Sequence, residues 1–341
     1  MSPCAPLPGL RRLLLALLIT FLPALALSQE VPGTRPREEL EVELLQARSY
    51  CRGLELQIEK VRKMYPKLKV ELLAAETSWK ASPFYQASKS IDEGMRAQVG
   101  KAATDFLKDI DAKGLALMKE LGTDPKTELE AKIFLASLET HAKGKFAFPS
   151  VRGNLLWQYK PYQDKPEKEF EHGFVESVQH PLNPGLSLKV PMSWKAKPSK
   201  SKDTLAFSNN YGHGFITFNF TPKPYPLLAK LVATPQETFD SITKEITEEE
   251  YKELGMTLKT FSKTQLNGMP AVIITVSKPV EQLGTKLVLE FEVIQVLAKK
   301  QMLIFSLCSP GPADSDAGLK RLQKNEPLFK AIVSSLEIAK E

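Results

Sequence analysis

The chain has 341 residues, of which 43% are hydrophobic and 25% are charged, and its formal net charge at pH 7 is +6. This composition is typical of a folded protein and excludes disordered and fibrous classes. The length suits two domains, and so mild a positive charge does not indicate a nucleic-acid partner.

Residues 1–28 have the pattern of a secretory signal peptide. Two arginines precede an apolar run from Leu13 to Leu22, and small residues suited to cleavage follow it. The run is shorter than the roughly 20 residues that a membrane span needs, and Pro23 interrupts it. We therefore expect a periplasmic or secreted protein with no transmembrane segment after cleavage.

Residues 29–143 are predicted to form an α-helical domain. The first helix, about Glu38 to Met64, carries apolar or small residues at alternating steps of four and three, which is the spacing of a coiled-coil seam. This seam predicts either a hairpin with a second helix after Pro66 or a contact between two copies, so the chain is expected to be a monomer or a helix-mediated dimer. The seam consists of Leu40, Leu44, Ala47, Cys51, Leu54, Ile58 and Val61.

Two more helices are predicted in this domain. The third runs from about Gln86 to Leu121. The fourth begins at Asp124-Pro125 and ends near His141, where Pro125 suits a first helical turn. The apolar spacing of the fourth helix predicts that Leu129, Ile133 and Leu138 face inward. Charges of alternating sign along these helices are typical of solvated surfaces.

Residues 144–173 are predicted to be a proline-rich boundary segment, because repeated prolines and glycines end the helical periodicity there. The segment also carries several large aromatic and aliphatic residues, which are costly to leave in water. We expect it to pack along the surface of a domain.

Residues 174–341 are predicted to form the second domain, which combines strands with helices. A capping box at Thr234 starts a helix, and a β-meander follows it. Within the meander, Asn267-Gly268 is the residue pair that suits a tight hairpin turn. The last helix is expected to break near Pro327.

The order of these segments resembles the PsbP-like family over about residues 174–339. The resemblance lies in the strand and turn of residues 186–194, the capped helix at Thr234, the hairpin of residues 267–270, and the two closing segments, residues 308–310 and 329–338. The family includes photosystem extrinsic proteins, a Ran-binding type and bacterial envelope proteins. The resemblance implies an α+β fold, in which an antiparallel sheet lies between helices. It implies no functional residue, because its motifs are structural.

Residues 241–244 match the catalytic pattern SxxK, but so short a pattern arises often by chance. No motif for phosphate binding or metal binding is found, so we expect a non-enzymatic protein without a cofactor or metal. The four histidines, His141, His172, His180 and His213, do not have metal-ligand spacing. Cys51 and Cys308 could pair in an oxidising compartment, but they are expected in different domains, which does not favour a disulfide.

The candidate contact surface is a lysine-rich segment that surrounds Pro198. Its lysines suit an anionic partner surface, and the tryptophan at its start suits a rigid anchor. The alternative is a solvated loop in which the tryptophan belongs to the domain core. The candidate residues are Trp194, Lys195, Lys197, Lys200 and Lys202.

These observations predict an interaction or scaffold protein that binds a protein partner or an anionic envelope surface. The alternative is a carrier, in which the sheet and the aromatic boundary segment enclose a small apolar ligand. An enzyme is the least favoured class, because the sequence offers no nucleophile, base or metal cluster.

Overall fold

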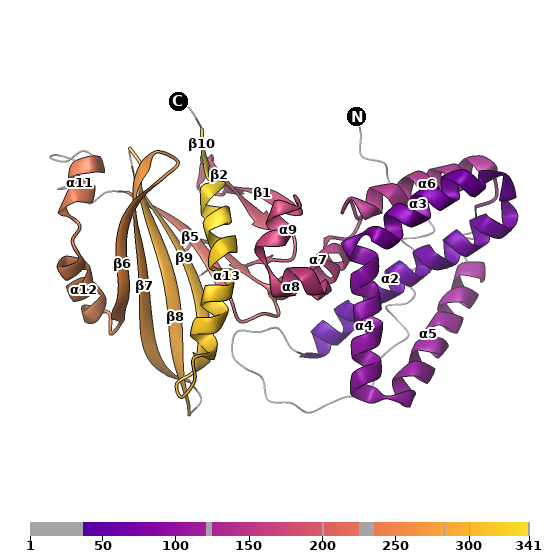
Figure 1. Cartoon of the computed structure of the whole chain (residues 1–341), viewed down its shortest axis with the longest axis horizontal. Helices are drawn as coiled ribbons and strands as arrows, with labels where there is room; N and C mark the ends of the chain where they lie inside the picture. The colour runs from indigo at the N-terminus through magenta and orange to yellow at the C-terminus, as the bar shows by residue number, and fades with distance from the viewer. Residues whose placement is uncertain are drawn as a thin grey trace. The chain divides into compact units, whose positions relative to one another are not determined.

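The computed structural model describes residues 37–120, 125–199, 201–224, 235–282, 284–299 and 301–339. The expected signal peptide, residues 1–28, lies outside the described residues. The chain divides into two compact units, of which the first ends at Asp164 and the second begins at Lys165. Within the described residues, the first unit consists of helices and the second combines sheets with helices (Figure 1).

In the first unit, helix α2 contacts four other helices, namely α3, α4, α5 and α7. It therefore lies at the centre of a helical cluster and belongs to more than a two-helix hairpin. The elements of this unit are α2 (Arg37–Met64), η1 (Pro66–Leu68), α3 (Lys69–Ala81), α4 (Pro83–Val99), α5 (Lys101–Glu120), α6 (Glu128–Ala142), α7 (Pro149–Gln158) and α8 (Lys160–Asp164).

The predicted seam of α2 is buried within the chain. Leu40 and Leu44 near its start are half-buried. The other five seam residues are at most 3% exposed, and they are Ala47, Cys51, Leu54, Ile58 and Val61. The heptad spacing of α2 thus serves packing against helices of the same chain.

A buried arginine fixes the position of α4 and α5 on α2. Arg48 is 4% exposed, and its Nε donates to Asp92 of α4 at 2.7 Å. Its two terminal nitrogens donate to Asp111 of α5. A buried guanidinium is tolerated only where acceptors neutralise it, so these two carboxylates specify which helices pack beside α2.

The helix expected from about residue 86 to residue 121 is two helices. Gly100 ends α4 with a φ of +65°, and α5 begins at the next residue. A left-handed residue cannot continue a right-handed helix, and glycine adopts that conformation without steric cost. The prediction treated the apolar spacing as continuous and missed this glycine.

The predicted inward face of α6 is wrong at two of its three positions. Leu138 is buried, but Leu129 is 68% exposed and Ile133 is 48% exposed. The residues of α6 that face the core are Ala131, Phe134, Leu135 and Leu138. The apolar residues therefore fall on opposite faces of this helix, and the prediction combined residues of both faces, although the buried set alone follows the i, i+3, i+4, i+7 pattern.

The boundary segment, residues 144–173, folds into α7, α8 and α9 (Glu167–Glu171). Leu155 and Leu156 of α7 are fully buried, and α7 packs on α2 and α4. The division between the two units falls between α8 and α9, so the segment contributes to both units.

The second unit contains a seven-stranded sheet, with strand order β3-β4-β5-β9-β8-β7-β6, and a three-stranded sheet, with order β1-β2-β10. Every pairing in these sheets is antiparallel. The strands are β1 (Val175–His180), β2 (Asn183–Pro191), β3 (Lys195–Lys197), β4 (Leu205–Ser208), β5 (Thr217–Pro224), β6 (Thr257–Leu266), β7 (Met269–Gln282), β8 (Thr285–Leu297), β9 (Gln301–Pro312) and β10 (Glu337–Ile338). The helical elements are α9, η2 (Asn210–Gly212), α11 (Pro235–Ser241), α12 (Lys244–Glu253) and α13 (Ala317–Ser334).

Helices cover both faces of the seven-stranded sheet (Figure 1). Ile294 of β8 packs in the larger core with Phe329 of α13. Its neighbour Val293 points to the other face and joins a smaller core with Phe239 of α11 and Tyr251 of α12. This alternation confirms the predicted α+β fold, in which an antiparallel sheet lies between helices.

The predicted meander is confirmed as β6 to β9. Asn267 and Gly268, at the turn between β6 and β7, have φ of 51° and 75°, as a tight hairpin turn of this type requires. The helix expected from Thr234 is instead the pair α11 and α12, and Thr234 itself lies outside the described residues. Thr243 caps α12 by accepting a hydrogen bond from the Ile246 amide.

The expected break in the last helix is wrong, because α13 continues through Pro327. Proline removes one backbone donor from a helix, and its ring crowds the preceding turn. Leu328, Phe329, Ile332 and Val333 follow Pro327 and are buried in the larger core. The burial of these four side chains favours the continuous helix despite that cost.

We predict that residues 165–341 fold alone with one cooperative transition. Glu169 of α9 is buried and accepts from Ser193 through the backbone amide at 2.8 Å and the hydroxyl at 2.5 Å. Glu169→Ala in this fragment should lower the free energy of unfolding by about 1–3 kcal/mol, because it leaves two buried donors unpaired.

Urea denaturation measures this effect. Glu171→Ala is the control, since Glu171 is exposed and pairs at the surface with Lys168, so its loss should change the free energy of unfolding little. Equal losses for the two variants, or a fragment without dispersed amide resonances, would contradict the account of this unit.

Candidate functional site

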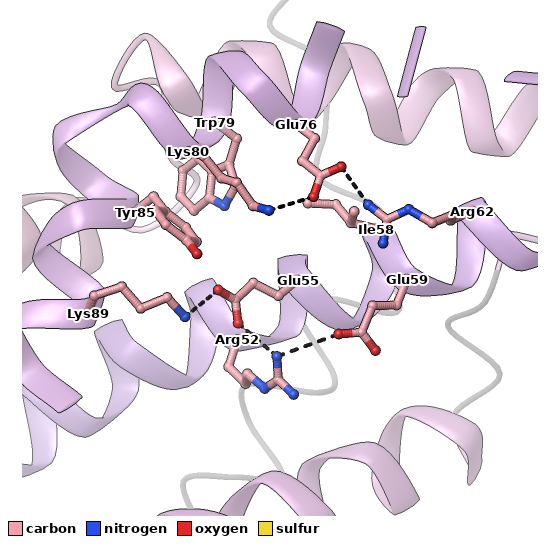
Figure 2. Close-up of a pocket in the computed structure, with 10 residues that line it drawn as sticks. All are labelled: Arg52, Glu55, Ile58, Glu59, Arg62, Glu76, Trp79, Lys80, Tyr85 and Lys89. Atoms are coloured by element: carbon pink, nitrogen blue, oxygen red, sulfur yellow. Dashed lines mark hydrogen bonds and ion pairs between the residues drawn. The ribbon is translucent and has the colours of Figure 1, made fainter. Parts of the chain in front are cut away.

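A pocket of about 290 Å³ lies between α2, α3 and α4 of the first unit (Figure 2). Helical spacing brings its residues together, because the polar residues of α2 recur at steps of three and four along one side of the helix. On α3 and α4, pairs four residues apart face the same space. The lining residues are Arg52, Glu55, Ile58, Glu59 and Arg62 of α2, Glu76, Trp79 and Lys80 of α3, and Tyr85 and Lys89 of α4.

Glu76 anchors one side of the pocket. One of its oxygens lies 2.8 Å from Lys80 Nζ, and the other accepts from Arg62 at 2.5 Å. Burial alone would raise the pKa of Glu76, but the hydrogen bonds and charges of Lys80 and Arg62 outweigh burial and lower it. This carboxylate therefore stays ionised and already has two cationic partners.

Glu55 has the same role on the opposite side. It accepts from Lys89 Nζ at 2.5 Å and from Arg52 at 2.8 Å, and Arg52 also lies 3.9 Å from Glu59. The Lys89 ammonium is 4.9 Å from the centroid of the Tyr85 ring. Figure 2 shows these side chains converging on the space between the three helices.

Trp79 forms the inner wall of the pocket. Its side chain is fully buried, and its indole Nε1 has no hydrogen-bond partner among the described residues. Tyr85 packs edge-on against the indole with the ring centroids 6.2 Å apart. The pocket thus combines charged side chains with an unpaired buried donor.

Sequence reasoning missed this pocket, because it assigned the alternating charges of these helices to solvated surfaces. The available signal was the repetition of charged residues at i and i+4 near an aromatic pair. That signal is weak, since such spacing also occurs on ordinary helix surfaces.

An exposed apolar surface lies on two neighbouring helices of the same unit, α3 and α6. Val70 is 77% exposed and Leu73 is 62% exposed on α3. Leu129 and Ile133 are the exposed apolar residues of α6. We call these four residues the apolar face.

The lysine-rich segment is more ordered than the predicted loop. Lys195–Lys197 form β3, the edge strand beside β4, and Trp194 is 7% exposed within the larger core. The Lys195 ammonium lies 5.1 Å from the centroid of the Tyr211 ring. Lys202 is exposed, and Lys200 lies outside the described residues. Trp194 thus has a packing role, and Lys195, Lys197 and Lys202 remain as candidate contact residues.

Two carboxyl groups lie on the α13-facing side of β8. Glu292 is 5% exposed, and burial raises its pKa to about 7, with the charge of Glu326 adding to the effect and that of Lys330 opposing it. Burial also raises the pKa of Glu290, although Lys259 opposes it. One Glu290 oxygen is buried without a partner among the described residues.

The remaining polar candidates do not converge on one place. His141 donates to or accepts from Tyr50 at 2.5 Å inside the helical core, where burial lowers its pKa. Cys51 and Cys308 are both free thiols. Across the described residues, no group of three or more His, Cys, Asp or Glu side chains could hold a metal ion. In the same residues, no helix is long and apolar enough to cross a membrane.

Comparison with known proteins finds similar folds for about half of the chain. A crystal structure from Bacteroides thetaiotaomicron has 12% identity and a TM-score of 0.29, covering 50% of this chain and 49% of that one. The Ran-binding protein Mog1p of Saccharomyces cerevisiae has 9% identity and a TM-score of 0.34, covering 49% and 96%. Cyanobacterial PsbP from Synechocystis has 12% identity and a TM-score of 0.30, covering 48% and 92%.

No protein-family model matches the chain, and no curated protein matches it either. The structures of Mog1p and cyanobacterial PsbP share only 9–12% identity with this chain. Such similarity concerns the fold, and no functional residue is carried over from these proteins.

The carboxyl group of Glu292 predicts a pH dependence of stability. Below its ordinary pKa of 4.5 the group is protonated in both states and contributes nothing. Between pH 4.5 and about 7 the unfolded chain releases the proton while the folded chain keeps it, so the free energy of unfolding falls as pH rises. The total loss is about 3 kcal/mol.

Glu292→Gln removes this loss. The variant should exceed the wild type in stability by up to about 3 kcal/mol at pH 8 and differ little at pH 4.5. Urea denaturation at the two pH values measures the difference, with exposed Glu281→Gln as the control. The same difference at both pH values would show that the effect comes from packing and not from ionisation.

Proposed function

We propose that this chain is a non-enzymatic, periplasmic or secreted interaction protein whose helical unit binds a protein partner through the apolar face of α3 and α6. The apolar face carries the proposal, because its four large side chains are 48–77% exposed. Contiguous exposed apolar surface is uncommon on proteins that have no partner.

Helices α3 and α6 pack against each other, and the charges along them indicate that the four residues share one surface. Lys67, just before α3, interacts electrostatically with Glu128 of α6. One turn later, Glu71 of α3 interacts electrostatically with Lys132 of α6. Since both members of the second pair lie four residues further along, the two helices run side by side in the same direction.

The order of residues around each helix completes this argument. On α3, Glu71 lies between the buried stripe of Leu72 and Ala75 and the exposed residue Val70. On α6, Glu128 and Lys132 likewise lie between the buried stripe and the exposed residues Leu129 and Ile133. The apolar residues of both helices therefore lie on the same outer side, where one partner can cover them.

A folded protein suits this surface better than a membrane. The charges bordering it have both signs, since Glu71, Glu128 and Lys132 lie beside Val70 and Leu129. Covering one such side chain contributes roughly 1.5–3 kcal/mol, so four together supply an anchor of useful size.

The lysine-rich segment supports a second contact with an anionic surface of the cell envelope. Lys195 and Lys197 lie on the edge strand β3, and Lys202 is exposed just after it. Ammonium groups at an edge strand attract anionic partners over a distance of about 8 Å at physiological salt. The extracytoplasmic location rests on the signal-peptide pattern of residues 1–28.

A photo-crosslinking experiment tests the protein contact. A photoreactive residue at position 73 should give one discrete adduct in the cells that produce the protein, whereas one at exposed position 108 of α5 should give none. Ile133→Lys should abolish the adduct at 73 without lowering the melting temperature, because residue 133 is solvent-exposed.

The adduct is identified by mass spectrometry. An adduct of twice the chain mass would assign the apolar face to self-association instead. The absence of a discrete adduct, or equal labelling at positions 73 and 108, would contradict the proposed contact.

The lysine-rich segment is tested by replacing Lys195, Lys197, Lys200 and Lys202 with serine. The melting temperature should change little, because Lys195 and Lys197 are only half-buried, Lys202 is exposed, and surface charges contribute little to stability. Cosedimentation with phosphatidylglycerol vesicles at low salt should be lost in this variant. Equal sedimentation of the two proteins would remove the segment from the proposal.

A further inference from the structure

We propose that the pocket between α2, α3 and α4 binds a small organic anion, which accepts hydrogen bonds from the indole of Trp79 and from the ammonium groups of Lys80 and Lys89. This site is separate from the apolar face, so a small molecule and a protein partner could occupy the helical unit together.

The unpaired indole is the first observation behind this site. Buried donors in folded proteins almost always have an acceptor, and an unsatisfied one calls for an explanation. Trp157 follows the rule, because its Nε1 donates to Asn154 at 3.0 Å. Trp79 is fully buried, lines the pocket, and finds no acceptor among the described residues. A ligand oxygen in the pocket would supply the missing acceptor.

The balance of donors and acceptors indicates the charge of the ligand. The pocket lining has four cationic side chains and three carboxylates. Glu76 and Glu55 each contact two cations of the chain. Each lysine ammonium has three N–H donors, whereas the pocket hydrogen bonds of Lys80 and Lys89 are to one glutamate each. The cationic side chains of the lining outnumber its carboxylates by one, and the indole of Trp79 adds an unpaired donor, which together suit a carboxylate or phosphate.

The size of the pocket limits the ligand to a small molecule. Its 290 Å³ correspond to the liquid volume of about ten water molecules. Ile58 and the Trp79–Tyr85 pair supply apolar walls for a compact carbon skeleton. The side chains of Lys80 and Lys89 are 52% and 41% exposed, so they border the solvent side, where an anion would enter.

The indole N–H resonance of Trp79 provides a direct readout in the full chain labelled with ¹⁵N-tryptophan. Three probes share one ring and differ in their polar group: benzoate, phenyl phosphate and the neutral benzamide. At low salt, at least one of the two anions should shift this resonance with saturation, and benzamide should not. The preferred anion distinguishes a carboxylate ligand from a phosphate ligand.

Variants test whether the shift reports the proposed contacts. Lys80→Gln and Lys89→Gln should each raise the dissociation constant of the anion at least about tenfold. Lys132→Gln is the matched control, since Lys132 also pairs with a glutamate four residues before it and has the same 52% exposure, but lies outside the pocket. Trp79→Phe assigns the resonance, and Trp157→Phe and Trp194→Phe, made separately, identify it by elimination if the first variant does not fold.

Two results would overturn the proposal. One is the absence of a saturable shift with either anion up to about 20 mM, where even weak specific sites are occupied. The other is a shift that is equal in the wild type, Lys80→Gln and Lys89→Gln, which would show a general response to ionic strength. Neither result bears on the apolar face, so this proposal can fail independently of the proposed function.

Discussion

A buried guanidinium determines how the helical unit is arranged. Arg48 lies in the middle of α2 with almost no exposure, and a charge in that position is tolerated only if acceptors surround it. Asp92 and Asp111 supply those acceptors from α4 and α5. Once α4 is held against α2 in this way, Lys89, less than one turn before Asp92, is directed at Glu55 of α2. The pocket is thus a consequence of how a buried charge is neutralised.

The helical unit presents two surfaces with different physical properties. The pocket is lined mostly by charged side chains that are already paired, with one more cation than carboxylates and with the unpaired indole donor of Trp79. The apolar face consists of four exposed aliphatic side chains, and removing them from water by covering them with another surface would be favourable. Both surfaces involve α3, since Trp79 lines the pocket while Val70 and Leu73 face solvent. One apolar side of α3 packs inside the helical unit, and its exposed apolar side is free for the proposed partner.

The sequence predicted those elements whose signals are local. The hairpin at Asn267-Gly268 follows from the backbone freedom of two adjacent residues, and the alternating strands that flank it follow from the twofold period. The inward face of α6 could have been predicted, because its buried residues Ala131, Phe134, Leu135 and Leu138 follow the i, i+3, i+4, i+7 pattern of one helix face. Leu129 is nine residues before Leu138 and therefore lies on the opposite face of the helix. The pocket depends on three helices, and Trp79 gives no sign in the sequence that its N–H lacks an acceptor.

The central claim is that the helical unit is the binding unit of this protein. Hydrogen–deuterium exchange of the full chain, alone and with an extract of the cells that produce it, tests this claim most directly. Binding at the apolar face should slow amide exchange in α3 and α6, because a covered helix pair opens less often, and should leave strands β5 to β9 of the second unit unchanged. Slower exchange confined to β3 to β9, with α3 and α6 unaffected, would contradict the account.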